Sequence, residues 1–219
     1  MTTAPDPVQK PAPGMLVDAM WAGSNADLGL IKSLLQQGAD INETDMFGDT
    51  ALTLAVQYGC VEIAKVLINA KADLDIQNDS GNTALITSLK FGRNKGEIAS
   101  LLIENGAKLD IQNKEGNTAL HIAAKWSYVE IIRQLLDKNA GLDIKNNDGD
   151  LAINFAERSG CTQTFDMLKE AAVMRKRPAP EFARAAKYQK RADTAAKLQK
   201  LRDAVKAKPK PVLKQPSAA

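Results

Sequence analysis

Two short motifs recur along this chain at a common spacing, and they constrain its fold more than any other feature. The first motif is a glycine followed by an Asp or Asn, then usually Thr-Ala-Leu, and it begins at Gly48, Gly81, Gly116 and Gly149. These glycines stand 33, 35 and 33 residues apart. The second motif keeps step with the first and begins at Gly38, Lys71, Gly106 and Asn139. A period of this length is typical of a repeat protein whose units stack on one another.

The second unit indicates a turn followed by two short antiparallel helices. Gly48 can supply the positive φ of a tight turn, and Thr50 stands where an N-cap would accept free backbone N–H groups. Apolar residues at helical spacing predict a first helix with Leu52, Ala55 and Val56 on one face, and a second helix from about Val61 to Lys71 with Ile63, Val66, Leu67 and Ala70. A unit of this kind cannot bury its apolar face alone, so several must stack to form a core.

These motifs resemble the ankyrin repeat, whose period is 33 residues and whose signature is a turn glycine followed by Thr-Pro-Leu-His. The resemblance extends from about Leu16 to Val173. Alanine replaces the signature proline in all four full motifs, and the histidine survives only as His121. Since proline is merely favoured at a helix start, alanine costs little there. The resemblance implies an all-α solenoid with turn or hairpin connections, in which His121 tethers adjacent turns by hydrogen bonding.

The spacing divides the chain into three parts. We expect a disordered Pro-rich leader over 1–14, an ankyrin repeat domain over 15–173, and a basic Ala/Lys-rich tail over 174–219. The domain should hold five repeats, at about 15–44, 45–77, 78–112, 113–145 and 146–173.

Two repeats depart from the common length. The first has three extra residues around Ser24 to Ala26, and its apolar residues are Leu30, Ile31, Leu34 and Leu35. The third repeat has two extra residues, which we place between its helices, within Gly92 to Gly96, because a loop absorbs an insertion at lower cost than a helix.

Composition excludes several classes of function. No apolar run is long enough to suggest a membrane span, and the N-terminus carries prolines but no apolar signal region. Cys60, Cys161 and the single histidine cannot form a metal site of the usual size, and the two cysteines should be free buried thiols in a reducing compartment. No catalytic motif occurs in a suitable local setting. We therefore expect no enzyme, no cofactor and a cytoplasmic location, with a nuclear location and secretion as an effector as the open alternatives.

Charge is distributed unevenly. Residues 1–174 hold 15 Lys/Arg against 23 Asp/Glu, giving −8, whereas residues 175–219 hold 14 against 3, giving +11. The tail could bind nucleic acid, an anionic membrane, an acidic protein or the acidic domain of its own chain, or it could be a solvated segment without a partner. Its candidate basic patch is Arg175, Lys176, Arg177, Lys187, Lys190 and Arg191.

Aligning the repeats on the family pattern indicates a protein-binding surface. The last inner-helix position that faces the concave groove in this family reads Tyr58, Phe91, Trp126 and Ser159, and the position before it reads Trp21, Gln57, Lys90, Lys125 and Arg158. Met46 and Phe47 form an apolar pair at a turn tip. Aromatic residues concentrate binding energy at interfaces, so we expect a partner protein here. The alternatives are that each ring packs on a neighbouring repeat, or that the basic tail carries the function and the repeats recruit a partner.

Overall fold

A computed structural model describes residues 11–91 and 95–176 of the chain. Two compact units make up the chain, Met1–Ala172 and Val173–Ala219, and only the first four residues of the second are described. The described part contains helices and turns, with one isolated bridge between Thr44 and Thr50 and no strand. The predicted all-α class is confirmed for these residues.

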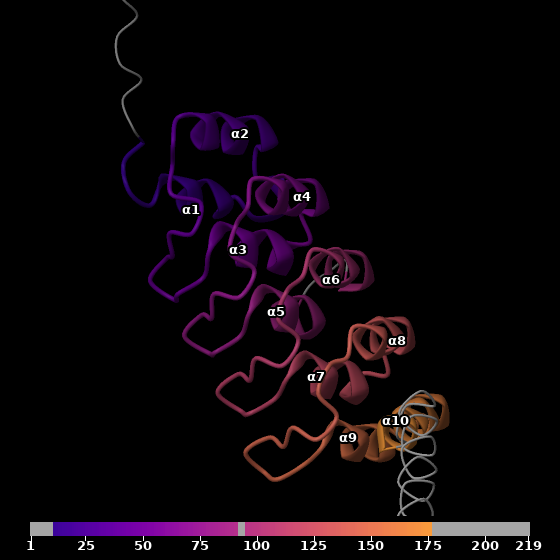
Figure 1. The fold of residues 1–219 in the computed structure, drawn as a ribbon. Coiled ribbons are helices and arrows are strands. Elements are labelled where there is room, and N and C mark those ends of the chain that lie inside the picture. Colours follow the sequence, from indigo (N-terminus) through magenta and orange to yellow (C-terminus); the bar gives the residue numbers. More distant parts are fainter. Residues whose placement is uncertain (1–10, 92–94, 177–219) are drawn as a thin grey trace, which may run out of the picture. The chain divides into compact units, whose positions relative to one another are not determined.

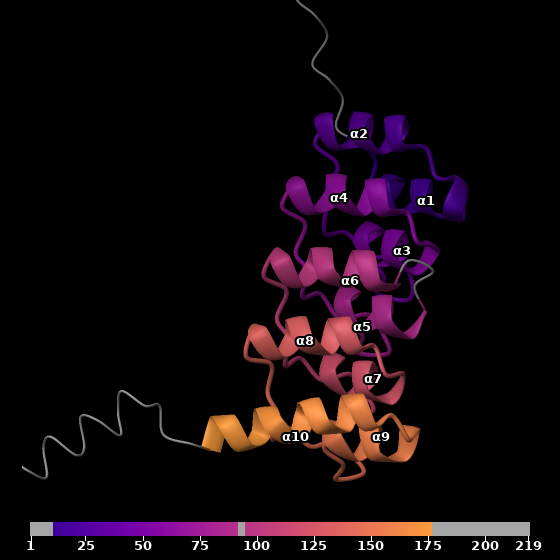
Figure 2. The same ribbon diagram turned by 90° about the vertical axis from the view of Figure 1, so that its right-hand side faces the viewer.

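The helices of the first unit form two columns, and the turns project from one of them (Figures 1 and 2). Within a column, successive helices contact each other, for example α3 with α5 and α4 with α6. The inner helices are α1 (Met15–Met20), α3 (Ala51–Tyr58), α5 (Ala84–Lys90), α7 (Ala119–Lys125) and α9 (Ala152–Ser159). The outer helices are α2 (Leu28–Gln36), α4 (Val61–Asn69), α6 (Lys95–Glu104), α8 (Val129–Asp137) and α10 (Thr162–Lys176). Five helix pairs thus occur where five repeats are expected, and the bounds of the repeats stay a prediction.

Three of the inner helices, α3, α5 and α7, begin directly after the threonines of the recurring motif. Thr50 Oγ1 accepts a hydrogen bond of 3.1 Å from the N–H of Thr53, and Thr83 Oγ1 accepts one from Ile86. Gly59 ends α3 in the left-handed conformation. Leu52, Ala55 and Val56 are buried as expected, and they pack into a core whose buried hydrophobic side chains, among the described residues, include no Phe, Trp or Tyr.

The outer helix of the second repeat follows its prediction less closely. Ile63 and Leu67 are buried, but Val66 is half-buried and Ala70 is exposed. Its end is as expected, because Lys71 takes a positive φ of 68°, as the glycines at this position do. Asn139 does the same at the end of α8. The solenoid therefore stops these two helices without glycine.

The first repeat has its own means of closure. The extra residues form a short 3-10 helix, Gly23–Asn25, and Leu30 is exposed while Ile31 and Leu34 are buried. The Glu43 carboxylate accepts hydrogen bonds from the N–H groups of Gly14 (2.7 Å) and Leu16 (2.9 Å). A side chain from the following turn thus satisfies N–H groups at the start of α1, where no threonine motif exists. The rest of the predicted leader, residues 1–10, lies outside the described residues.

The sequence places the insertion of the third repeat between its two helices, within Gly92 to Gly96. The helix α5 ends at Lys90 and α6 begins at Lys95, so no continuous helix joins them. Lys95 and Gly96 belong to α6, which has 10 residues against nine in α4 and α8. Gly92 to Asn94 lie outside the described residues. The placement of the two extra residues in a loop between the helices therefore stays a prediction.

We expect the tail to contribute little to the stability of the repeats. The predicted end at Val173 falls three residues short of the end of α10 at Lys176, but Val173 and Met174 are exposed. Among the described residues, Leu168 is the last that is fully buried. A chain truncated after Lys176 should therefore melt within a few degrees of the full chain, because attraction between net charges is largely screened at physiological salt. Thermal unfolding of both chains by circular dichroism measures this. A much lower melting temperature of the truncated chain would show that the tail packs as part of the fold.

Candidate partner-binding surface

An Asp or Asn organises each turn between repeats. Asn113 Oδ1 accepts hydrogen bonds from the N–H groups of Glu115 (3.0 Å) and Asn117 (2.9 Å). The same pair of bonds forms at Asp45, Asn78 and Asn146. Side chains of Asp and Asn that accept hydrogen bonds from N–H groups two and four residues on are typical of turns, so these four residues have a structural role.

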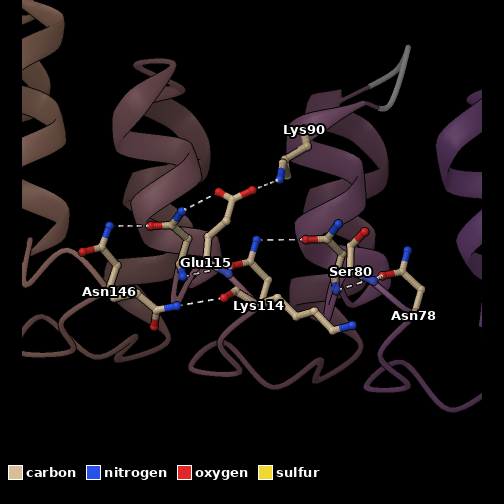
Figure 3. Close-up of polar contacts among 10 residues, drawn as sticks. Asn78, Ser80, Lys90, Lys114, Glu115 and Asn146 are labelled. Carbon is tan, nitrogen blue, oxygen red and sulfur yellow. Dashed lines mark hydrogen bonds and ion pairs between the residues drawn. The ribbon is translucent and has the colours of Figure 1, made fainter.

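The turns are also bonded to one another (Figure 3). Asn113 Nδ2 donates to Asn82 Oδ1 at 3.0 Å, and Asn146 Nδ2 donates to Asn117 Oδ1 at 3.1 Å. The backbone adds a bond of 3.0 Å from the N–H of Lys114 to the carbonyl of Ser80. These contacts fix the spacing of successive turn tips, so the side chains at the tips are presented from a rigid row.

His121 connects α7 to the next turn. Its Nδ1 accepts a hydrogen bond from the Thr118 N–H at 3.2 Å and lies 2.8 Å from the Thr118 hydroxyl, so its Nε2 carries the proton and donates to the Asp150 carbonyl at 3.1 Å. Burial lowers the pKa of this histidine, which keeps the ring neutral. The expected structural role, a tether between turns, is confirmed.

Two of the three predicted aromatic anchors are exposed. Phe91 and Trp126 are 56% and 54% exposed at the ends of α5 and α7. A lysine ammonium lies over each ring, with Lys90 Nζ 5.6 Å from the Phe91 centroid and Lys125 Nζ 5.8 Å from that of Trp126. Each ring thus keeps a face close to a cation and remains accessible to a partner.

Tyr58 differs from this pattern. It is half-buried, and its ring lies 3.7 Å from the position that a Cβ would take on Gly23. The 3-10 helix formed by the insertion therefore packs against this ring. The expectation of three successive exposed aromatics is wrong at Tyr58, because the first repeat covers part of it.

The predicted charged positions are partly engaged within the chain. Lys90 forms an ion pair of 2.8 Å with Glu115, and this contact lowers the pKa of the glutamate. Arg158 pairs with Asp150 and lies over the Phe155 ring at 5.3 Å. The side chains of Gln57 and Lys125 are exposed.

A separate apolar group lies at the N-terminal end of the turn row. Met46 is 82% exposed, Phe47 52% and Trp21 48%. The rings of Trp21 and Phe47 lie 6.3 Å apart at an interplanar angle of 49°. The sequence aligned Trp21 with Gln57 on the inner helices, and the structure brings it beside a turn tip.

The cysteines and the described part of the basic patch form no comparable surface cluster. The two cysteines are free, but they are half-buried rather than buried; Cys60 Sγ donates to the Gly23 carbonyl at 3.5 Å. The described residues contain no group of His, Cys, Asp and Glu suited to a metal ion, and none of their helices is long and apolar enough to cross a membrane. Of the tail patch, Arg175 is exposed and Lys176 ends α10, whereas Arg177, Lys187, Lys190 and Arg191 lie outside the described residues.

Stacked pairs of short helices, joined by hydrogen-bonded turns and tethered by a histidine, define a helical repeat protein. The chain belongs to the ankyrin repeat family: a model of that family, described as ankyrin repeats (3 copies), matches residues 19–113 and 90–177. Proteins of this family are generally modules for protein–protein interaction, and typically not enzymes.

Curated relatives match only part of the chain. Neurogenic locus notch homolog protein 1 of Homo sapiens is 44% identical over 57 residues, which is 26% of this chain and 2% of the relative. The Xenopus laevis protein of the same name is 39% identical over 62 residues, 28% of this chain and 2% of that protein. Ankyrin repeat domain-containing protein 37 of Bos taurus is 40% identical over 50 residues, 23% of this chain and 32% of that protein. The chain thus spans a third or less of each of these relatives.

Proposed function

We propose that this chain is a non-enzymatic scaffold that binds a partner protein on the concave face of its solenoid. This face would consist of the exposed side chains of the inner helices and of the turn tips before them. The observation that supports it best is the pair of exposed rings, Phe91 and Trp126, at the same position of consecutive inner helices. Aromatic residues are only 5% of the chain, and large exposed rings are the side chains that most often dominate a protein interface.

The packing of the inner helices that carry these rings favours the same function. The inner helices are held by a continuous core and by turns bonded to their neighbours, so little conformational freedom remains to be lost when a partner binds. Lower ordering cost leaves more of the contact energy as affinity. Lys90 is also held in place by Glu115, which keeps its ammonium beside the Phe91 ring.

We expect Phe91→Ala and Trp126→Ala to weaken partner binding while leaving the fold nearly intact. Each exposed interface ring can contribute about 2 kcal/mol to binding, whereas truncation of an exposed side chain removes little of the core. The measurement is quantitative affinity capture from cell extract by wild type and variants, with melting temperatures determined in parallel. Leu30→Ala on the outer helix α2 is the matched control, because Leu30 is also an exposed apolar residue.

Two results would contradict the proposal. If the same proteins are captured in equal amount by the ring variants and by the Leu30→Ala control, the rings bind no partner. If both ring variants melt far below wild type, the rings stabilise the repeats and are not anchors.

A further inference from the structure

The N-terminal end of the turn row combines exposed apolar side chains with carboxylates. We call Trp21, Met46, Phe47, Asp45, Asp49 and Asp79 the acidic-apolar patch. Phe47 connects the apolar part of this patch with the acidic part. Its ring lies beside that of Trp21, and its carbonyl accepts a hydrogen bond of 2.9 Å from the N–H of Asp79. Asp49 Oδ1 in turn accepts a hydrogen bond of 2.8 Å from Asn78 Nδ2.

The three carboxylates of this patch form no ion pair with any cation of the described part of the chain. Burial raises the pKa of Asp49, the hydrogen bond from Asn78 lowers it, and the negative charges of Asp45 and Asp79 each raise it further. By contrast, Glu115 and Asp150 further along the row are paired with Lys90 and Arg158.

The patch also leaves one hydrogen-bond acceptor unused. Asn78, Asn113 and Asn146 each donate their side-chain N–H to the turn before them. Asp45 holds the same position in the first turn, and its Oδ2 is buried with no hydrogen-bond partner in the described structure. Because this oxygen is buried, it offers no exposed acceptor, but the unpaired carboxylate keeps its negative charge beneath the patch.

We propose that the acidic-apolar patch binds a basic amphipathic segment of the partner protein, in which Lys or Arg alternates with large apolar side chains. A cation held between an aromatic face and carboxylates gains from both, and the apolar side chains of the segment cover Met46 and Phe47. The inference rests on the proposed function and specifies the partner at one end of the surface.

Charge distinguishes this occupant from others. The carboxylates would repel a phosphate backbone or an anionic lipid surface. Residues 1–10 of the chain hold one Asp and one Lys, Asp6 and Lys10, and bring no net positive charge to the patch. The basic tail of the chain does have the required sign, so the experiment has to separate it from a partner.

Trp21 provides a direct reporter. The chain has two tryptophans, so in a full-length Trp126→Phe variant the emission comes from Trp21 alone. The probe is a short acetylated and amidated peptide in which arginine alternates with leucine and phenylalanine. A second peptide with citrulline in place of arginine has almost the same shape without charge. We expect saturable quenching or shift of Trp21 emission by the arginine peptide, weakened by salt, and affinity about tenfold lower for the citrulline peptide.

The matched variant is the triple change Asp45→Asn, Asp49→Asn and Asp79→Asn. Two of these positions hold Asn in the repeats that follow, as Asn78 and Asn82, and the third holds Asn147 in the last full turn, so the fold should tolerate all three changes. Affinity for the arginine peptide should fall about tenfold. Asp148→Asn, an exposed acid at the tip of the last turn, should leave it unchanged.

Four results would overturn the inference. Equal binding of both peptides, or unchanged affinity of the triple variant, would show that the carboxylates do not select the ligand. A change of Trp21 emission with salt in the absence of peptide, absent from the triple variant, would show that the basic tail of the chain occupies the patch. If the peptide does not bind but Phe91 and Trp126 are needed for partner capture, this inference fails while the proposed function stands.

Discussion

Replacing Gly116 with alanine should cost about 3–4 kcal/mol of unfolding free energy, the largest effect that we expect from a single substitution. Gly116 has φ +77°, which costs a residue with a Cβ about 1–2 kcal/mol. A Cβ at this position would also lie 2.5 Å from the backbone nitrogen of Asn147. The turn of the next repeat would have to move away, which weakens the bond between the Asn147 N–H and the Glu115 carbonyl. Denaturant unfolding followed by circular dichroism measures the loss.

The substitution Gly149→Ala separates the cost of the positive φ from the cost of the close contact with the next turn. Gly149 stands at the same position of the last turn with φ +83°, but nothing lies within 4 Å of the position of its Cβ. Its substitution should therefore cost only the backbone part, about 1–2 kcal/mol. Equal losses at Gly116 and Gly149 would mean that close approach of successive turns does not limit the residue at this position.

His121→Ala should cost about 3 kcal/mol at neutral pH. The substitution removes the acceptor of the Thr118 N–H and the donor to the Asp150 carbonyl, each worth about 1 kcal/mol. It also leaves a cavity beside Phe155, whose ring centroid lies 5.7 Å from that of the imidazole in a T-shaped arrangement. His121→Asn is the matched variant, because Asn154 Oδ1 already accepts the N–H of Leu151 at the equivalent position of α9. It should recover about 1 kcal/mol by keeping the cap but losing the tether.

The contribution of His121 to the unfolding free energy should also decrease as the pH falls. Its pKa is lowered in the folded chain, so protons bind the unfolded state first, and stability is lost as the pH falls below the ordinary value of 6.5 toward the folded pKa. His121 is the only histidine, so the two variants should not show this loss in that range. The measurement is unfolding free energy from pH 7 downward. A parallel decline in wild type and His121→Asn would show that the histidine is not responsible.

The helices were predictable because each is specified by residues close together in sequence. Thr50 and Gly48 act within their own turn, and Leu52, Ala55 and Val56 share a face through helical spacing alone. Asp45 and Asn113 likewise act within their own turns, because each accepts hydrogen bonds from N–H groups two and four residues on. Lys71 could be placed at a helix end by its alignment with glycines, although its own side chain gave no such signal.

The binding surface was less predictable because it depends on contacts between repeats. Tyr58 is covered by Gly23, and the ion pair of Lys90 with Glu115 joins residues 25 positions apart. Sequence alignment compares each residue with its equivalents, so it could not show Trp21 beside Phe47, since these residues are not equivalent. The extra residues in the first repeat were the available signal that its geometry differs from the others.

The row of turn asparagines has a direction. Each amide of Asn78, Asn113 and Asn146 accepts with its oxygen and donates with its nitrogen, so each turn is linked to the one before it. At the start of the row, Asp45 has no side-chain N–H with which to donate a hydrogen bond. At the other end, the carboxylate of Asp150 could accept a hydrogen bond from a further turn. Duplication of a repeat after the last turn would preserve the pattern of bonds, and duplication before the first would interrupt it. An array of this kind can therefore gain repeats at its C-terminal end while keeping the same hydrogen bonds between turns. A repeat added at the N-terminal end would need different contacts at the junction.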